Sequence, residues 1–193
     1  VCVSQCPRGT YKDITMNMQY EQPQQDQAAT FPTSAQYTEE QLLIQDMTKN
    51  FADEQIKPYA AEWDTHGTFP TTALKQMGEL GLMGMLVPEQ WGGSETGNLA
   101  YVLALEEIAA ADGATSTIMS VHNSVGCVPI LKYGTDEQKQ RFLVPLARGE
   151  MIGAFALTGP HSGSDAAAIK TRAVKGGEHY ILNGAQQFIS SGD

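Results

Sequence analysis

From Thr38 to about residue 148, apolar residues recur every three or four positions, and polar residues fill most positions between them. The first run follows Thr38, which forms a capping-box pattern with Gln41, and Pro58 should kink or divide it. Its predicted inward residues are Leu42, Leu43, Met47, Phe51, Ile56, Tyr59 and Trp63. The pattern predicts an amphipathic helix, kinked or divided at the proline, at the start of the ordered chain.

Four more helical segments follow, separated by breaks that contain glycine. We expect them at about 71–80, 98–112, 114–134 and 135–148, which makes five helices. Gly81 and Gly113 should stop the first two, and Thr135, with Gln138 three residues later, should cap the last. The predicted inward residues are Leu74, Met77, Leu80, Leu99, Val102, Leu103, Ile108, Phe142 and Leu143.

The pattern changes after residue 150. The run MIGAFALT is continuously apolar, which predicts a short buried strand, and residues 169–191 alternate between apolar and polar positions. Hairpin-turn signals occur at Gly176-Gly177 and at Asn183-Gly184. Three or four strands are therefore expected to follow the helices.

The predicted organisation has three parts. Residues 1–36 lack periodicity and are rich in Gln, Pro, Ala and Thr, so we interpret them as a disordered leader. Residues 37–149 form an all-α domain and residues 150–193 begin a β-domain, which together predict the α+β class. So few strand residues would leave open sheet edges, and we therefore expect this β-domain to be truncated at its C-terminus.

Composition argues against several classes of protein. The formal net charge is -10, which disfavours a nucleic-acid partner, and no apolar run is long enough to predict a membrane span. The three cysteines and four histidines lack metal-ligand spacing, so no metal site is expected, and the cysteine usage favours a reducing compartment. His66, His122, His161 and His179 are each interpreted as surface or core histidines. Glu106 and Glu107 diverge by about 100° on a helix, so a catalytic carboxylate pair is not expected.

The stretch LTGPHSGSD, residues 157–165, concentrates polar and flexible residues. Thr158, Ser162 and Ser164 offer hydroxyl donors, Gly163 permits a close backbone approach, and free N–H groups in such a turn can bind an anion or a cofactor ring. An ordinary surface β-turn is the simpler interpretation of the same residues. The residues alone leave both interpretations open, because the chain has no G-x-G-x-x-G, P-loop or G-x-S-x-G motif.

Five motifs in order resemble the acyl-CoA dehydrogenase family. They are LGLMGMLVPEQWGG, ALEEIAAAD, GTDEQKQRFLVPLARGE, FALTGPHSGSD and YILNGAQQFISS, and the resemblance covers about 38–193. It implies an N-terminal helical domain, the beginning of a middle β-barrel-like domain, and a C-terminal helical domain that this chain lacks. It also implies FAD-dependent α,β-dehydrogenation of an acyl-CoA, in which a carboxylate removes the α-proton and hydride passes to flavin N5.

The resemblance assigns roles to individual residues. Thr158 would hydrogen-bond the flavin ring, Phe188 would lie against it and Ser190 would reach toward N5. Gly163 and Ser164 match the turn near the pyrophosphate, and Ser164 also matches a contact to the acyl-CoA substrate. The implied cofactor-binding residues are Phe155, Leu157, Thr158, Gly163, Ser164, Phe188, Ile189 and Ser190. The family's catalytic base lies in the missing C-terminal domain, so no catalytic residue is assigned, and the chain alone is expected to be inactive.

The same resemblance implies partners and a location. An electron-transferring flavoprotein would accept the electrons, the full-length protein would be a homotetramer or homodimer, and it would act in the bacterial cytoplasm or the mitochondrial matrix. The segment IMSVHNSVGCVPILKYG looks most like short-chain or short branched-chain members.

Three departures from the family pattern leave alternatives open. Gly159 stands where Glu is usual, His161-Ser162 where Gly-Ala is common, and Ser190 where Thr is common. These changes could alter flavin affinity. The alternatives are an acyl-CoA oxidase or another flavin enzyme of the same fold, and a non-catalytic helical scaffold.

Overall fold

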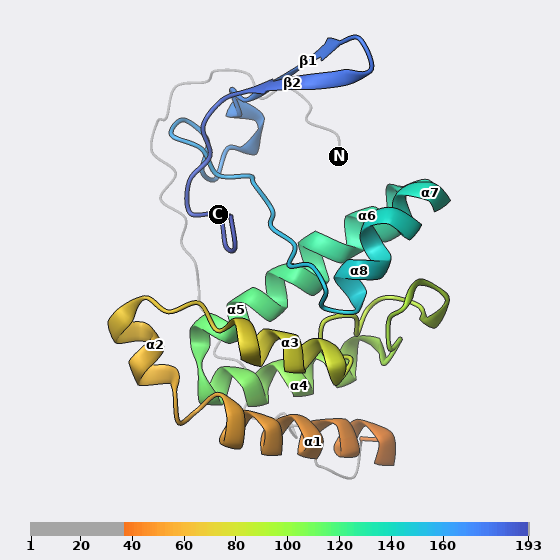
Figure 1. The fold of residues 1–193 in the computed structure, drawn as a ribbon, viewed down its shortest axis with the longest axis vertical. Coiled ribbons are helices and arrows are strands. Elements are labelled where there is room, and N and C mark those ends of the chain that lie inside the picture. The colour runs from red at the N-terminus through yellow and green to blue at the C-terminus, as the bar shows by residue number, and fades with distance from the viewer. Residues whose placement is uncertain (1–36, 193) are drawn as a thin grey trace, which may run out of the picture. The chain divides into compact units, whose positions relative to one another are not determined.

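The computed structural model describes residues 37–192, in which helices make up the first part and a β-hairpin lies near the end (Figure 1). The described residues therefore show the predicted α+β class. The predicted leader, residues 1–36, lies outside them.

Helix α1 (Glu39–Gln55) begins at the predicted capping box. The Gln41 N–H donates to Thr38 Oγ1 at 3.2 Å, and the Thr38 N–H donates to Gln41 Oε1 at 3.0 Å. The predicted division at Pro58 is also confirmed, because α2 (Ala60–His66) begins just after it.

The other predicted helical segments are helical in the structure. They contain α3 (Thr71–Glu79), α4 (Gly97–Ala111), α5 (Gly113–Val121), the π-helical η3 (His122–Cys127), α6 (Val128–Tyr133), α7 (Asp136–Gln138), the π-helical η4 (Lys139–Leu143) and α8 (Val144–Ala147). The 3₁₀ turns η2 (Glu89–Trp91) and η5 (Ala166–Ala168) lie outside the predicted segments. Two of the predicted helices thus contain a π-helical turn, a feature often found near functional sites.

A single extended residue, Asp112, separates α4 from α5. Its φ of -157° breaks the helix, and its carboxylate accepts a hydrogen bond from the Thr115 N–H at 2.7 Å. Gly113 was predicted to end the third helix, but it begins α5 instead. The side chain of Asp112 caps the new helix and supplies the break that the glycine was expected to make.

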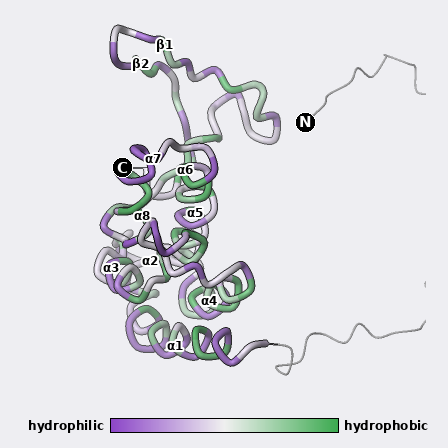
Figure 2. Tube along the Cα trace, turned by 90° about the vertical axis from the view of Figure 1, so that its right-hand side faces the viewer, coloured by the Kyte–Doolittle hydropathy of each residue, from purple (hydrophilic) through white to green (hydrophobic). Residues whose placement is uncertain are grey.

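The main core lies where α1, α3, α4 and α5 meet the connector after α3. Fully buried members include Ile56, Leu74, Met77, Leu82, Met83, Met85, Ile108 and Met119. Hydrophobic and hydrophilic residues alternate along α1 in Figure 2, as expected for a helix with one buried face. Gln45 of α1 also donates to Glu107 of α4 at 2.8 Å, which gives that glutamate a structural partner.

Several predicted inward residues are wrong. The exposed ones are Leu43, Tyr59, Leu80, Leu99, Val102 and Phe142. In α4 the buried face is formed by Ala100, Ala104 and Ile108, four residues apart, whereas Leu99 is 45% exposed. Apolar residues occur all round this helix, so periodicity could not identify the face that packs on α1.

Two strands form an antiparallel hairpin. Strand β1 (Arg172–Gly176) pairs with β2 (His179–Asn183), with Gly176 opposite His179 and a two-residue turn between them. The turn residues are Gly177, with φ +69°, and Glu178, so the first predicted hairpin is confirmed with its turn one residue later than expected. The second predicted turn, at Asn183-Gly184, ends β2 but forms no hairpin among the described residues.

The predicted buried strand at 151–158 is wrong. These residues carry no strand pairing, and Ala154, Phe155, Ala156 and Leu157 are exposed. A strand needs a ladder partner, and the described residues offer none to this segment. The described part of the chain accordingly has two paired strands, where three or four were expected.

Neither a membrane-crossing helix nor a metal-binding cluster occurs in the described residues. Among residues 37–192, no helix is both long and apolar enough to span a bilayer. In the same residues, no group of three His, Cys, Asp or Glu side chains is placed to hold a metal ion.

Candidate functional site

The polar stretch at 157–165 forms a narrow turn closed by its own backbone. The Gly159 N–H donates to the Ser162 carbonyl at 2.9 Å, and the Ser162 N–H donates back at 3.2 Å. Ser162 is buried, and Asp165 accepts from the Ala167 N–H at 3.1 Å. The turn is therefore fixed on both sides, while Gly163 and Ser164 between these anchors are exposed.

A segment distant in sequence joins this turn. The Gln187 N–H donates to the Thr158 carbonyl at 2.8 Å. With its side-chain amide oriented to satisfy every neighbour, Gln186 donates to the carbonyls of Leu157 at 2.9 Å and Thr158 at 2.7 Å, and accepts from the Thr171 hydroxyl at 2.8 Å. These bonds bring the two predicted flavin-contacting stretches, 155–164 and 188–190, to one junction.

The site residues implied by the family resemblance lie on both sides of this junction. Thr158, Ile189 and Ser190 are half-buried, while Phe155, Leu157 and Phe188 are exposed. Phe188 is 88% exposed, a large apolar side chain that no described residue covers. The structure brings Thr158 next to the second stretch, but no contact places Gly163 or Ser164 against it, and an added Cβ on Gly163 would meet nothing within 4 Å.

Backbone strain marks the second stretch. Phe188 has φ +58° and Ser191 has φ +56°, a region that bulky residues rarely adopt. The Ser191 hydroxyl is buried and has no hydrogen-bond partner among the described residues. Strained residues and unpaired polar atoms tend to gather at binding sites, so this stretch has the character of one.

Gly159 is closely packed in this structure, at a position where the family usually has Glu. A Cβ at this position would lie 3.0 Å from the Ala185 carbonyl oxygen and 3.2 Å from Ser162 Oγ. A larger residue would push the two stretches apart by a few tenths of an ångström. Gln186 was not predicted as a site residue; the only sequence signal was that Gln186-Gln187 interrupts the alternation.

Two adjacent buried residues in η3 hold different parts of the chain. His122 Nε2 donates to the Leu146 carbonyl at 3.0 Å, and its Nδ1 accepts from the Gly153 N–H at 2.9 Å. Asn123 accepts from the Met85 N–H at 3.0 Å and donates to the Leu82 carbonyl at 3.0 Å. In the sequence, the one weak signal for these two residues is a His-Asn pair within a segment of small and apolar residues.

Stability should fall with acidification through His122. Burial lowers the pKa of this imidazole, although the Leu146 and Met83 backbones oppose the shift. In the unfolded state this imidazole has a pKa near 6.5, so below that pH the unfolded protein binds more protons than the folded protein. The free energy of unfolding therefore keeps its full value above about pH 6.5 and declines below it. Urea unfolding at pH 7.5 and pH 5.5 should show the wild type losing about 1 kcal/mol more than His122→Gln. Equal losses would contradict this assignment.

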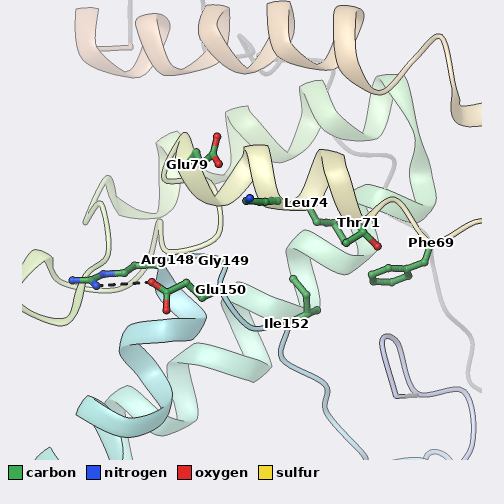
Figure 3. A pocket seen from close by; sticks show the side chains of 9 residues that line it. Phe69, Thr71, Leu74, Glu79, Arg148, Gly149, Glu150 and Ile152 are labelled. Atoms are coloured by element: carbon green, nitrogen blue, oxygen red, sulfur yellow. Dashed lines mark ion pairs between the residues drawn. The ribbon is translucent and has the colours of Figure 1, made fainter.

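A separate pocket of about 450 Å³ lies between α3 and the segment after α8 (Figure 3). Leu74 and Thr71 line one side, and Gly149 and Ile152 line the other. In Figure 3, Arg148 and Glu150 form an ion pair at its rim, with the charged atoms 3.9 Å apart.

Comparisons with known proteins show the family of this chain. The family model described as "Acyl-CoA dehydrogenase, N-terminal domain" matches residues 38–150. An acyl-CoA dehydrogenase of Bacillus subtilis is 45% identical over 155 residues, which are 80% of this chain and 41% of that protein. The mitochondrial short-chain specific acyl-CoA dehydrogenase of Mus musculus is 42% identical over 158 residues, 82% of this chain and 38% of that protein.

A solved structure of the same family shares the fold. The acyl-CoA dehydrogenase of Bacillus anthracis, described as complexed with FAD, superposes with a TM-score of 0.76 at 35% identity, covering 82% of this chain and 28% of that one. The chain thus spans about two fifths of the length of the curated relatives it matches. The family model, these identities and the shared fold show that the chain belongs to the acyl-CoA dehydrogenase family, whose N-terminal-domain model matches residues 38–150.

Proposed function

We propose that this chain supplies the helical domain and the flavin-facing stretches of an FAD-dependent acyl-CoA dehydrogenase that acts on short or short branched acyl-CoA thioesters. The observation that carries the proposal is the junction at Thr158, where Gln186 and Gln187 join two stretches that resemble the family's flavin contacts. A relative named short-chain specific supports the substrate class, and a family member described as complexed with FAD supports the cofactor.

The residues present fit a flavin. Phe155, Leu157 and Phe188 offer uncovered apolar surface for a planar ring, and such surface excludes water from the reacting atoms. The Ser191 hydroxyl is buried without a partner, which suits a site completed by a ligand or by further chain. When bound, FAD would supply the hydride acceptor for the dehydrogenation.

Each residue near the ring then has a defined task. Thr158 and Ser190 would donate hydrogen bonds to the flavin, and Ser190 would reach toward N5, where a donor favours the reduced form. Phe188 would lie against the ring, with Ile189 next to it in the same stretch. Gly163 and Ser164 would lie near the pyrophosphate, and Ser164 would also contact the acyl-CoA. The chain itself holds no assigned catalytic base, so we expect turnover only from the complete enzyme and none from residues 1–193 alone.

The proposal extends to partners and location. Electrons would leave through an electron-transferring flavoprotein, and the complete enzyme would be a homotetramer or homodimer. Its location would be the bacterial cytoplasm or the mitochondrial matrix, in keeping with the bacterial and mitochondrial relatives.

Removal of single hydroxyls tests this assignment. In the complete enzyme, Thr158→Val and Ser190→Ala should each weaken FAD binding about tenfold, because each removes one hydrogen bond to the ring. Flavin fluorescence quenching measures the dissociation constant. Ser116→Ala is the matched control, since that hydroxyl bonds only the Gly113 carbonyl within α5. Unchanged FAD affinity in both site variants would contradict the proposed site.

A further inference from the structure

Residues 152–156 carry the chain from the helices to the flavin-facing turn, and we call them the exit segment. They form neither helix nor strand. Among the hydrogen bonds of the described residues, one holds the exit segment: the Gly153 N–H donates to His122 Nδ1 at 2.9 Å. The neighbouring anchors lie outside it, at Met151 before it and at Leu157 after it.

His122 is itself held in one orientation. The side chain is fully buried, and its Nε2 donates to the Leu146 carbonyl of α8 at 3.0 Å. That bond places the ring proton on Nε2 and leaves Nδ1 as an acceptor for Gly153. The imidazole therefore links three parts of the chain: η3, α8 and the exit segment.

The exit segment passes close to η3 at this contact. A Cβ on Gly153 would lie 3.3 Å from Gly126 Cα and 3.5 Å from His122 Nδ1. Directly before Gly153 in the chain, Ile152 lines the 450 Å³ pocket shown in Figure 3. The exit segment thus has the pocket beside Ile152, its first residue, and is hydrogen-bonded to η3 through Gly153.

We propose that His122 is a positioning residue for the flavin site: its ring fixes the path on which the exit segment leaves the helices and thereby places Thr158. The inference rests on the proposed flavin contact of Thr158. The sequence distance is short, because four residues lie between Gly153 and Thr158, and the exit segment makes no other hydrogen bond among the described residues.

Three variants of the complete enzyme test this role. His122→Phe keeps an aromatic ring but removes both hydrogen bonds, whereas His122→Gln keeps a donor and an acceptor on one side chain. Thr115→Val is the control: it removes a buried hydroxyl that bonds Asp112 at the start of α5, the helix that leads directly into η3. FAD dissociation constants are compared at matched fractions folded, and hydrogen exchange is followed in the peptide that contains Gly153.

We expect His122→Phe to weaken FAD binding about tenfold or more and to speed exchange at Gly153, even without flavin. His122→Gln should recover most of both losses, and Thr115→Val should change neither. If His122→Phe binds FAD as the wild type does, or if Thr115→Val weakens binding equally, the positioning role is overturned. A wild type that binds no FAD would overturn the proposed function and this inference together, and slow exchange at Gly153 would then still report the His122 contact.

Discussion

Replacing Asn123 with leucine is expected to lower the free energy of unfolding by about 4 kcal/mol, because each stranded buried polar group costs about 1–3 kcal/mol. The Asn123 amide is fully buried and bonds the Met85 N–H, the Leu82 carbonyl and the Met119 carbonyl at 3.0 to 3.1 Å. Leucine has a similar size but leaves the Met85 and Leu82 groups unpaired. The connector after α3 would lose its attachment to the helix it packs on.

Urea unfolding followed by circular dichroism measures the loss, and Ser124→Ala is the matched control. Ser124 is the next residue and is half-buried, but its hydroxyl bonds only the Ser120 carbonyl of the same helix at 2.6 Å. We expect the control to change stability by about 0.5 kcal/mol or less. If the leucine variant loses less than about 1 kcal/mol, Asn123 does not hold the connector as described.

Replacing Gly184 with valine is expected to weaken FAD binding by about 10- to 100-fold in the complete enzyme. A Cβ at Gly184 would clash with the Thr171 hydroxyl oxygen and lie 2.7 Å from Thr171 Cα. The chain after β2 can relieve this clash only by moving away from Thr171. Gln186 would then be displaced from Thr171 and Thr158, and the two flavin-facing stretches would separate.

The control for this variant introduces the same side chain in the same hairpin. Ala173→Val lies on exposed β1, opposite Leu182, and should leave FAD affinity unchanged. The circular dichroism signal of the helices should be the same in both variants, because Gly184 follows β2 and is not part of any helix from α1 to α8. Wild-type FAD affinity in Gly184→Val would show that the junction does not shape the flavin site.

The helical part of the fold was predictable because local signals determine it. The capping boxes at Thr38 and Thr135, the division at Pro58 and the helical periodicity all act over a few residues. The buried face of α4 was not predictable, because apolar residues surround that helix and only its packing on α1 selects Ala100, Ala104 and Ile108. The strand at 151–158 failed for a related reason, since an apolar run pairs only where a partner strand exists.

The site was predictable in part. Its loop residues could be predicted because hydroxyls and glycines cluster at 157–165, and the family resemblance assigned them a role. The contacts that hold the site could not be predicted. Gln186 and His122 act through hydrogen bonds to residues far away in sequence, and the motifs that contain them do not reveal these partners.

The most direct test is the visible absorbance spectrum of the complete enzyme during anaerobic addition of butyryl-CoA. We predict a yellow protein with flavin bands that bleach on addition of the thioester, whereas the chain of residues 1–193 alone should stay colourless. Rapid reoxidation of the bleached enzyme by oxygen would instead favour an acyl-CoA oxidase. A colourless complete protein that binds no added FAD would contradict the account and favour the non-catalytic scaffold.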